Sequence, residues 1–443
     1  MTDFDQLDRR IVTALDEIAL PQRPAYLDDV FRQTARMAQR PRWTFLERWL
    51  PVDTVTQRPV SLPRLPVRPL ILLVMLAALI AAATLAFVGS QRHVPAPFGP
   101  AANGLVAYTS GNDLYVRDTL SGAGRLVVTG QGSHSFPSFS PDGRWLAYVT
   151  RGLGPDQFMV ARTDGSGSRL MAIIPATGNA QAAWRPDSQA IAFVYAVGGN
   201  PQLLITGLDG VHGPAIDLRG LIPWDVSWEP PTGGRLLVRG ESVIGHMDLV
   251  TLAPDGSDLK AFSLNRTSDF GSKYTLSGPT WSPYGKTIAF NSIEEVKGAD
   301  GKPYSHFRVH LIAADGTNER ATSGPSDPKV QEGWPLYSPD GRWILLHHWV
   351  FKGDAVFQGN RQVVPNGWLA IMPADGSAPA RDIGPMIPGG EDSDITKIWS
   401  PDGTRVLMQA GNLQQVYSID PTTGAYERLD WTSDLPDWQR VAP

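Results

Sequence analysis

The chain has 443 residues, of which 42% are hydrophobic and 19% are charged, and its formal net charge is −5. This balance is typical of a folded chain and excludes a largely disordered one. The sequence contains no cysteine, which excludes disulfide bonds and every zinc or iron–sulfur centre held by thiolates. No strongly basic segment is present, so a nucleic-acid-binding surface is not expected.

Residues 1–68 show short helical patterns broken by prolines. Apolar residues recur at three- and four-residue steps in residues 4–18, a second pattern runs from Pro24 to Pro41, and residues 43–50 form a third apolar-basic piece. Short helices with exposed apolar faces often fold against a partner. The candidate partner-binding residues here are Leu27, Phe31, Trp43 and Trp49. The alternative is a tail on the membrane surface, with its tryptophans in the interface.

Residues 70–88 predict a transmembrane helix, assigned to 69–89. They are uncharged, Thr84 is their only polar residue, and 19 residues of helix span about 28 Å. Arg58, Arg64 and Arg68 precede this segment, whereas Arg92 alone follows it closely. The excess of basic residues predicts a cytoplasmic N-terminus, a cell-membrane location and an extracytoplasmic C-terminal part. A Pro-rich stretch, residues 90–102, reads as a semi-rigid linker.

Two alternating motifs repeat through residues 103–443. The first is an aromatic residue followed by Ser-Pro-Asp-Gly or a variant of it, and then an apolar run. Its copies begin at Phe139, Trp184, Trp228, Trp281, Tyr337 and Trp399. The second motif is a short apolar strand that runs into a turn with Asp or Gly, and it occurs seven times. Such turns suit tight hairpins, and strand-rich units of this period stack into a ring. The aspartates of these turns are expected to be turn formers.

The pattern predicts an all-β fold, a β-propeller of about seven blades. Six blades would result if the first and last units formed one closing blade. The Trp-Ser-Pro-Asp-Gly run followed by Ile-Ala-Phe resembles the TolB-type, WD-like propeller repeat, and the resemblance covers roughly residues 103–430. It implies the fold and leaves the function open.

Strand order predicts that both hairpin turns of each blade lie on one face of the ring. The long insertions, residues 265–279, 291–306, 347–366 and 386–397, then gather on the opposite face, where we expect a partner or ligand to bind. The candidate residues of these loops are Tyr274, Tyr304, Trp349, Phe351, Phe357, Glu391, Asp392 and Asp394.

No catalytic or metal-ligating spacing is found in the sequence, so neither an enzyme, nor a metal site, nor a cofactor is expected. The alternative is a propeller hydrolase or lyase whose residues converge only in the fold, at the central channel. The layout also resembles a transmembrane anti-sigma factor without its zinc motif, which implies a sigma factor as a partner of residues 1–68. The sequence therefore favours a membrane-anchored binding or sensing protein with a protein or envelope ligand.

Overall fold

The computed structural model describes residues 99–443, apart from residues 153, 175–181, 198–199, 243–246, 263–275, 298–300, 302, 328, 352–365, 389–394, 411–414, 433–435 and 442–443. The predicted N-terminal helices, the predicted transmembrane helix and most of the predicted linker therefore lie outside the described residues. Within the described residues, no helix has the length and apolar character needed to cross a membrane.

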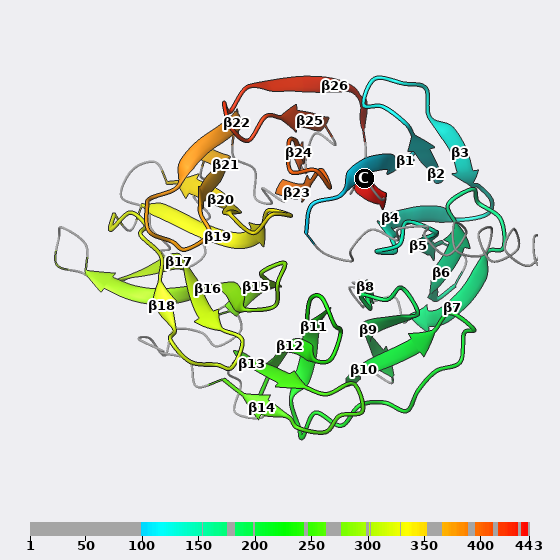
Figure 1. Cartoon of the computed structure of the whole chain (residues 1–443), viewed down its shortest axis with the longest axis horizontal. Coiled ribbons are helices and arrows are strands. Elements are labelled where there is room, and N and C mark those ends of the chain that lie inside the picture. Colours follow the sequence, from blue (N-terminus) through cyan, green and yellow to red (C-terminus); the bar gives the residue numbers. More distant parts are fainter. Residues whose placement is uncertain are drawn as a thin grey trace, which may run out of the picture. The chain divides into compact units, whose positions relative to one another are not determined.

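Seven antiparallel sheets form a ring, as Figure 1 shows, so the predicted seven-bladed propeller is confirmed. Blade 1 contains β27 (Asp437–Val441), β1 (Ala102–Ser110), β2 (Asp113–Arg117) and β3 (Arg125–Val128). Blade 2 contains β4 (Ser133–Phe139), β5 (Trp145–Arg151), β6 (Asp156–Arg162) and β7 (Arg169–Ile174). Blade 3 contains β8 (Ala182–Trp184), β9 (Ala190–Val197) and β10 (Asn200–Gly207).

The remaining four blades each have four strands. Blade 4 contains β11 (Ile222–Trp228), β12 (Leu236–Glu241), β13 (Met247–Leu252) and β14 (Lys260–Ala261). Blade 5 contains β15 (Leu276–Trp281), β16 (Thr287–Lys297), β17 (Pro303–Ala313) and β18 (Arg320–Ala321). Blade 6 contains β19 (Val330–Tyr337), β20 (Trp343–Val350), β21 (Asn366–Pro373) and β22 (Arg381–Ile387). Blade 7 contains β23 (Ile395–Trp399), β24 (Val406–Ala410), β25 (Gln415–Ile419) and β26 (Tyr426–Thr432).

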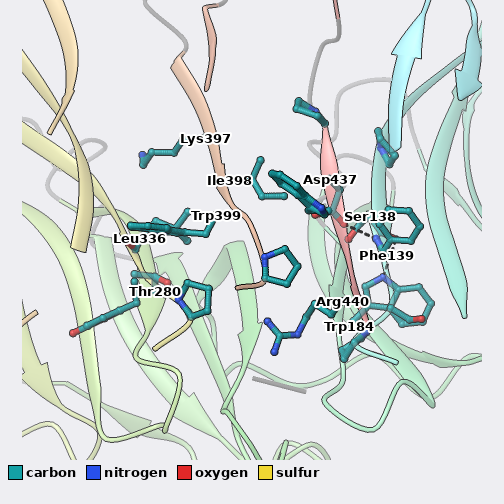
Figure 2. A pocket seen from close by; sticks show the side chains of 18 of the residues that line it. Ser138, Phe139, Trp184, Thr280, Leu336, Lys397, Ile398, Trp399, Asp437 and Arg440 are labelled. Carbon is teal, nitrogen blue, oxygen red and sulfur yellow. Dashed lines mark hydrogen bonds between the residues drawn. The ribbon is translucent and has the colours of Figure 1, made fainter. Parts of the chain in front are cut away.

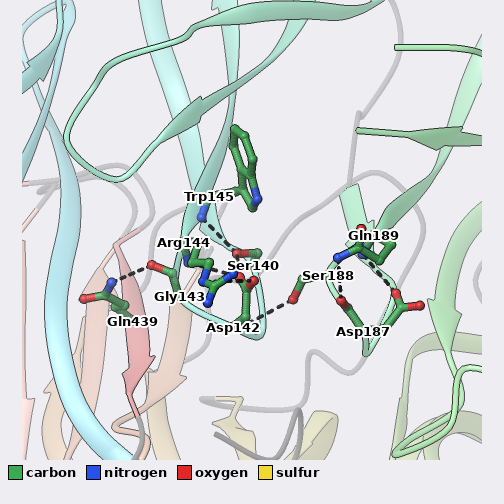
Figure 3. Close-up of polar contacts among 9 residues, drawn as sticks. All are labelled: Ser140, Asp142, Gly143, Arg144, Trp145, Asp187, Ser188, Gln189 and Gln439. Carbon is green, nitrogen blue, oxygen red and sulfur yellow. Dashed lines mark hydrogen bonds and ion pairs between the residues drawn. The ribbon is translucent and has the colours of Figure 1, made fainter. Parts of the chain in front are cut away.

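The Ser-Pro-Asp-Gly turns join the first and second strands of a blade, as predicted, and their polar side chains hold the turn. Figure 3 shows the blade 2 copy, where Ser140 Oγ donates to Asp142 Oδ1 over 2.6 Å and accepts from the Trp145 N–H over 3.0 Å. Gly143 has a φ of 69°, a left-handed conformation that glycine adopts readily. The same serine-to-aspartate bond recurs at Ser338 and at Ser400. These aspartates are turn formers, as the sequence predicts.

The hydrophobic core lies between neighbouring blades, because each sheet buries both of its faces. One cluster joins blades 6 and 7 through Leu345, Ile371, Trp399 and Met408, all at most 7% exposed. Similar clusters join the other neighbouring pairs. A blade without its neighbours would expose these side chains to water, so the ring is stable only when it is closed.

β27 closes the ring by supplying the innermost strand of blade 1, beside β1 from the beginning of the propeller. The Gln439 side chain accepts a hydrogen bond from the Leu105 N–H over 2.9 Å and donates one to the Gly143 carbonyl over 2.6 Å. Trp438 is buried between blades 1 and 7. The first unit lacks a Ser-Pro-Asp-Gly turn because its innermost strand comes from the far end of the chain, and the count therefore stays at seven.

One expected loop is largely strand. Residues 291–306 were expected as an insertion, but β16 and β17 pair continuously from Thr287 opposite Ala313 to Lys297 opposite Pro303. The β-branched residues Ile293 and Val296 suit this extended strand pairing.

Replacing Trp438 with alanine is expected to destabilise the protein by about 3–5 kcal/mol, because a buried indole at the closure is lost and a cavity remains. Trp343 is 38% exposed, and its replacement with alanine is expected to change stability by less than about 1 kcal/mol. Urea unfolding of both variants checks this. Equal stability losses would show that the closure does not limit the stability of the ring.

Candidate functional site

A channel of about 900 Å³ runs through the centre of the ring and is lined mainly by the innermost strands. Most of these strands end at an aromatic residue directly before the turn, for example Phe139, Tyr337 and Trp399. Trp438 takes this place in β27, since it pairs with Val106 as Phe139 pairs with Leu146. We call the number of residues by which a lining residue precedes this aromatic residue its level in the channel.

Asp437 lies one residue before that aromatic position in blade 1 and faces the channel (Figure 2). Its carboxylate Oδ2 accepts a hydrogen bond from the Phe139 N–H over 2.5 Å, which ties blade 1 to blade 2. Burial raises the pKa of Asp437 to about 6, although hydrogen bonds from the Phe139 and Trp438 backbones oppose that rise. The group therefore titrates close to neutral pH.

Lys397 lies two residues before the aromatic position in blade 7, the other neighbour of blade 1 (Figure 2). Burial lowers its pKa to about 7, because the surrounding protein solvates an ammonium group poorly. Among the described residues, no hydrogen bond or ion pair of its amine is found. Pro137 and Pro335 occupy the same level in blades 2 and 6, so a lysine at this position is a departure from its neighbours.

Two more basic side chains border the Lys397–Asp437 level. Arg440 lies further along β27, where its guanidinium donates to the Gly99 carbonyl, and burial lowers its pKa. His347, on β20, has a pKa well below its usual range because of burial and of the nearby Lys397 charge. With His347 neutral, the cationic side chains that line the described part of the channel are Lys397, Arg440 and Arg151. Acid–base residues of active sites are often found in such surroundings, where burial brings pKa values toward neutrality.

The predicted partner-binding residues are only partly described. Trp349 was expected in a loop, but it lies in β20, is 8% exposed and packs edge-on against Trp334 with ring centroids 4.9 Å apart. Phe351 directly follows β20, where its N–H donates to the Lys329 carbonyl over 2.9 Å. Tyr304 lies in β17. The remaining candidates lie outside the described residues: Tyr274, Phe357, Glu391, Asp392, Asp394, Leu27, Phe31, Trp43 and Trp49.

His347 and His348 are neighbours in β20, so their side chains point to opposite faces of the strand. His347 stacks on Trp334 with ring centroids 5.7 Å apart, whereas His348 Nδ1 contacts Asp382 Oδ1 over 2.5 Å. In contrast, no sequence pattern singles out Lys397 or Asp437. The one sequence feature that could have indicated the site is a lysine, Lys397, at a level where two other blades carry proline. This feature can be recognised only after the innermost strands are aligned by their register.

No family model matches the chain. One similar protein is named as the uncharacterized peptidase YuxL of Bacillus subtilis, which is 26% identical over 195 residues, covering 42% of this chain and 25% of that protein. A prolyl endopeptidase structure has a TM-score of 0.50 and 14% identity, covering 78% of this chain and 51% of that one. TolB from Acinetobacter baumannii has a TM-score of 0.41 and 18% identity, covering 62% of each chain.

The prolyl endopeptidase structure shares the propeller fold with this chain. The chain spans only a quarter of the curated relative's length. The expectation that the protein is not an enzyme is contradicted, because its sequence relative is named as a peptidase and its fold also occurs in a prolyl endopeptidase. Lys397 and Asp437 lie on separate blades and follow no fixed sequence spacing, so a search for short sequence motifs does not select them.

Replacing Lys397 with methionine is expected to stabilise the protein at pH 7 and below by roughly 4–5 kcal/mol, because each pKa unit corresponds to about 1.4 kcal/mol. The folded-state pKa of about 7 lies below the value of 10.5 for a free lysine, so the unfolded chain binds more protons between these values. The cost of burying the amine is therefore greatest below pH 7 and disappears toward pH 10.5. Thermal unfolding from pH 5 to 10 checks this, and a difference independent of pH would contradict it.

Proposed function

We propose that the protein is a propeller enzyme of the hydrolase or lyase class with its active site in the central channel. Asp437 acts as the general base and Lys397 as the general acid. The observation that carries the proposal is that a carboxyl group and an amine on neighbouring blades face one channel, with pKa values of about 6 and about 7.

The order of the two pKa values supports this assignment of roles. Between pH 6 and 7 most Asp437 is ionised and can accept a proton, while most Lys397 is protonated and can donate one. A base and an acid on separate strands can act on two atoms of one bound substrate, since neither depends on the other for its position. The positive charge of Arg440 further along the channel favours a substrate group that becomes negative during the reaction.

The name of the sequence relative supports a hydrolase over other classes. A peptidase breaks a bond by activating water and protonating a leaving group, and one base and one acid suffice for these two proton transfers. The Phe139 N–H holds the Asp437 carboxylate in place before substrate binds, which reduces the cost of orienting the base.

Turnover is expected to follow a bell-shaped pH profile with limbs near 6 and 7, and Lys397→Met is expected to lower kcat by about 100-fold or more. Asp437→Asn is expected to lower kcat to the same extent, because an amide cannot act as the base. Its side-chain oxygen can still accept the hydrogen bond from the Phe139 N–H. The measurement is turnover of a panel of fluorogenic peptides and oligosaccharides from pH 5 to 9, with Trp343→Ala as the control. Turnover that survives both channel substitutions would contradict the proposed active site.

We also propose that residues 70–88 anchor the protein in the cell membrane with the propeller on the extracytoplasmic side. The uncharged apolar run and the arginines before it support this topology. The full chain is expected to stay in the membrane fraction after alkaline extraction, and two arginine substitutions within residues 70–88 are expected to release it. Release of the unaltered chain by alkali would contradict the anchor.

A further inference from the structure

Three innermost strands present an aromatic side chain one level beyond Lys397, toward the face opposite the Ser-Pro-Asp-Gly turns. Phe136 and Trp334 lie three residues before the closing aromatic position of blades 2 and 6, and Trp224 lies four residues before it at a bulge in blade 4. Phe136 lines the channel, and Trp224 and Trp334 are 46% and 40% exposed. A half-exposed indole in the innermost layer needs an explanation, because the other core tryptophans are buried.

The backbone holds two of these residues in an unfavourable conformation. Phe136 has a φ of 55° and Trp334 a φ of 50°, both in the left-handed region that bulky residues rarely adopt. Each lies at a bulge in its innermost strand. Blade 5 makes the same bulge with Gly278, at a φ of 57°. An aromatic residue where glycine would be less strained is typical of a functional position.

Gly278 also makes room for Trp334. A Cβ atom at Gly278 would lie 3.3 Å from Trp334 Cδ1, so the indole sits directly against the neighbouring blade. His347 stacks against the indole at 26°, and Trp349 packs edge-on beside it. These contacts fix the orientation of the ring, although 40% of the residue stays open to solvent. Trp334 is therefore a rigid platform.

An arginine paired with an aspartate accompanies the aromatic ring in blades 2 and 4. The Arg151 guanidinium lies 4.8 Å from the Phe136 ring centroid, and its Nε donates to Asp156 Oδ2 over 2.9 Å. In blade 4, the Arg239 guanidinium lies 6.0 Å from the Trp224 ring, and its Nε donates to Asp225 Oδ2 over 2.5 Å. In both blades an aromatic ring thus lies next to charged donors and acceptors, with the guanidinium over the ring.

Prolines restrict what can bind along the innermost strands. Pro137, Pro223 and Pro335 stand beside the three aromatic residues, and none of them has a backbone N–H to donate. A peptide that binds by adding a strand needs that row of donors. The edge is therefore poorly suited to an extended peptide, and recognition falls to ring faces and polar side chains.

We propose that Phe136, Trp224 and Trp334 bind a glycan chain at the entrance to the channel. The C–H faces of its sugar rings stack on the aromatic side chains, and its hydroxyls bond to the Arg–Asp pairs. A chain held at this level places a glycosidic linkage over Lys397 and Asp437, one to two residues further into the channel. The inference rests on the proposed function, to which it adds the substrate class.

Isothermal titration calorimetry of the full chain in nanodiscs tests this, because sugar-headed detergents would compete for the site. The probes are three separate hexasaccharides, built of glucose, of N-acetylglucosamine and of galacturonic acid. Decaproline is the peptide probe. At least one hexasaccharide is expected to bind, and Trp224→Ala and Trp334→Gly are each expected to weaken binding about tenfold or more. Trp343→Ala, whose side chain lies outside the proposed site, is expected to bind as the unaltered chain does.

Trp334→Gly is chosen because Gly278 already adopts the same conformation, so the variant is expected to fold and to show a cooperative thermal unfolding transition. The inference would be overturned if decaproline bound and no hexasaccharide did, or if no hexasaccharide bound at millimolar concentration. It would also be overturned if both tryptophan variants bound a hexasaccharide as tightly as the unaltered chain. Tryptophan-dependent glycan binding without turnover would support the glycan site and refute the proposed enzyme. Lys397-dependent turnover of peptides without glycan binding would do the reverse.

Discussion

The whole structure depends on the closure of the ring by β27. Each blade buries its two faces only against its neighbours, so an open ring would leave two apolar faces in water. β27 prevents this by pairing with β1, and Trp438 and Gln439 fix it against blades 7 and 2. The same strand carries Asp437 and Arg440 into the channel. Closure of the fold and assembly of the candidate site are thus one event.

The fold was predictable because its signals are local. Within four residues the serine bonds to both the aspartate and the glycine, as Ser140 does to Asp142 and Gly143, so each turn can be recognised without knowledge of the rest of the chain. The number of blades was harder to predict, because the choice between six and seven depended on which strand pairs with β1. The register of β27 answers that question.

The candidate site could not be predicted in the same way. Lys397 and Asp437 have unremarkable neighbours in sequence, and their pKa values move toward neutrality only because the ring surrounds them. The prediction that aromatic residues bind a partner on the face opposite the turns placed those residues in loops. Trp349 instead supports Trp334 from within a strand, and the half-exposed rings lie at bulges of the innermost strands. A bulge changes the direction of one side chain and leaves no periodic trace in the sequence.

The candidate site requires that the Lys397 amine and the Asp437 carboxyl group in the channel each gain and lose a proton near neutral pH. Titration of the full chain by NMR, with ¹³C-labelled lysine and aspartate, tests it most directly, and Lys397→Met and Asp437→Asn identify the two signals. The account predicts midpoints of about 7 for Lys397 and about 6 for Asp437. Midpoints at the ordinary values of 10.5 and 3.8 would show that the channel solvates both groups as water does, and would contradict the account.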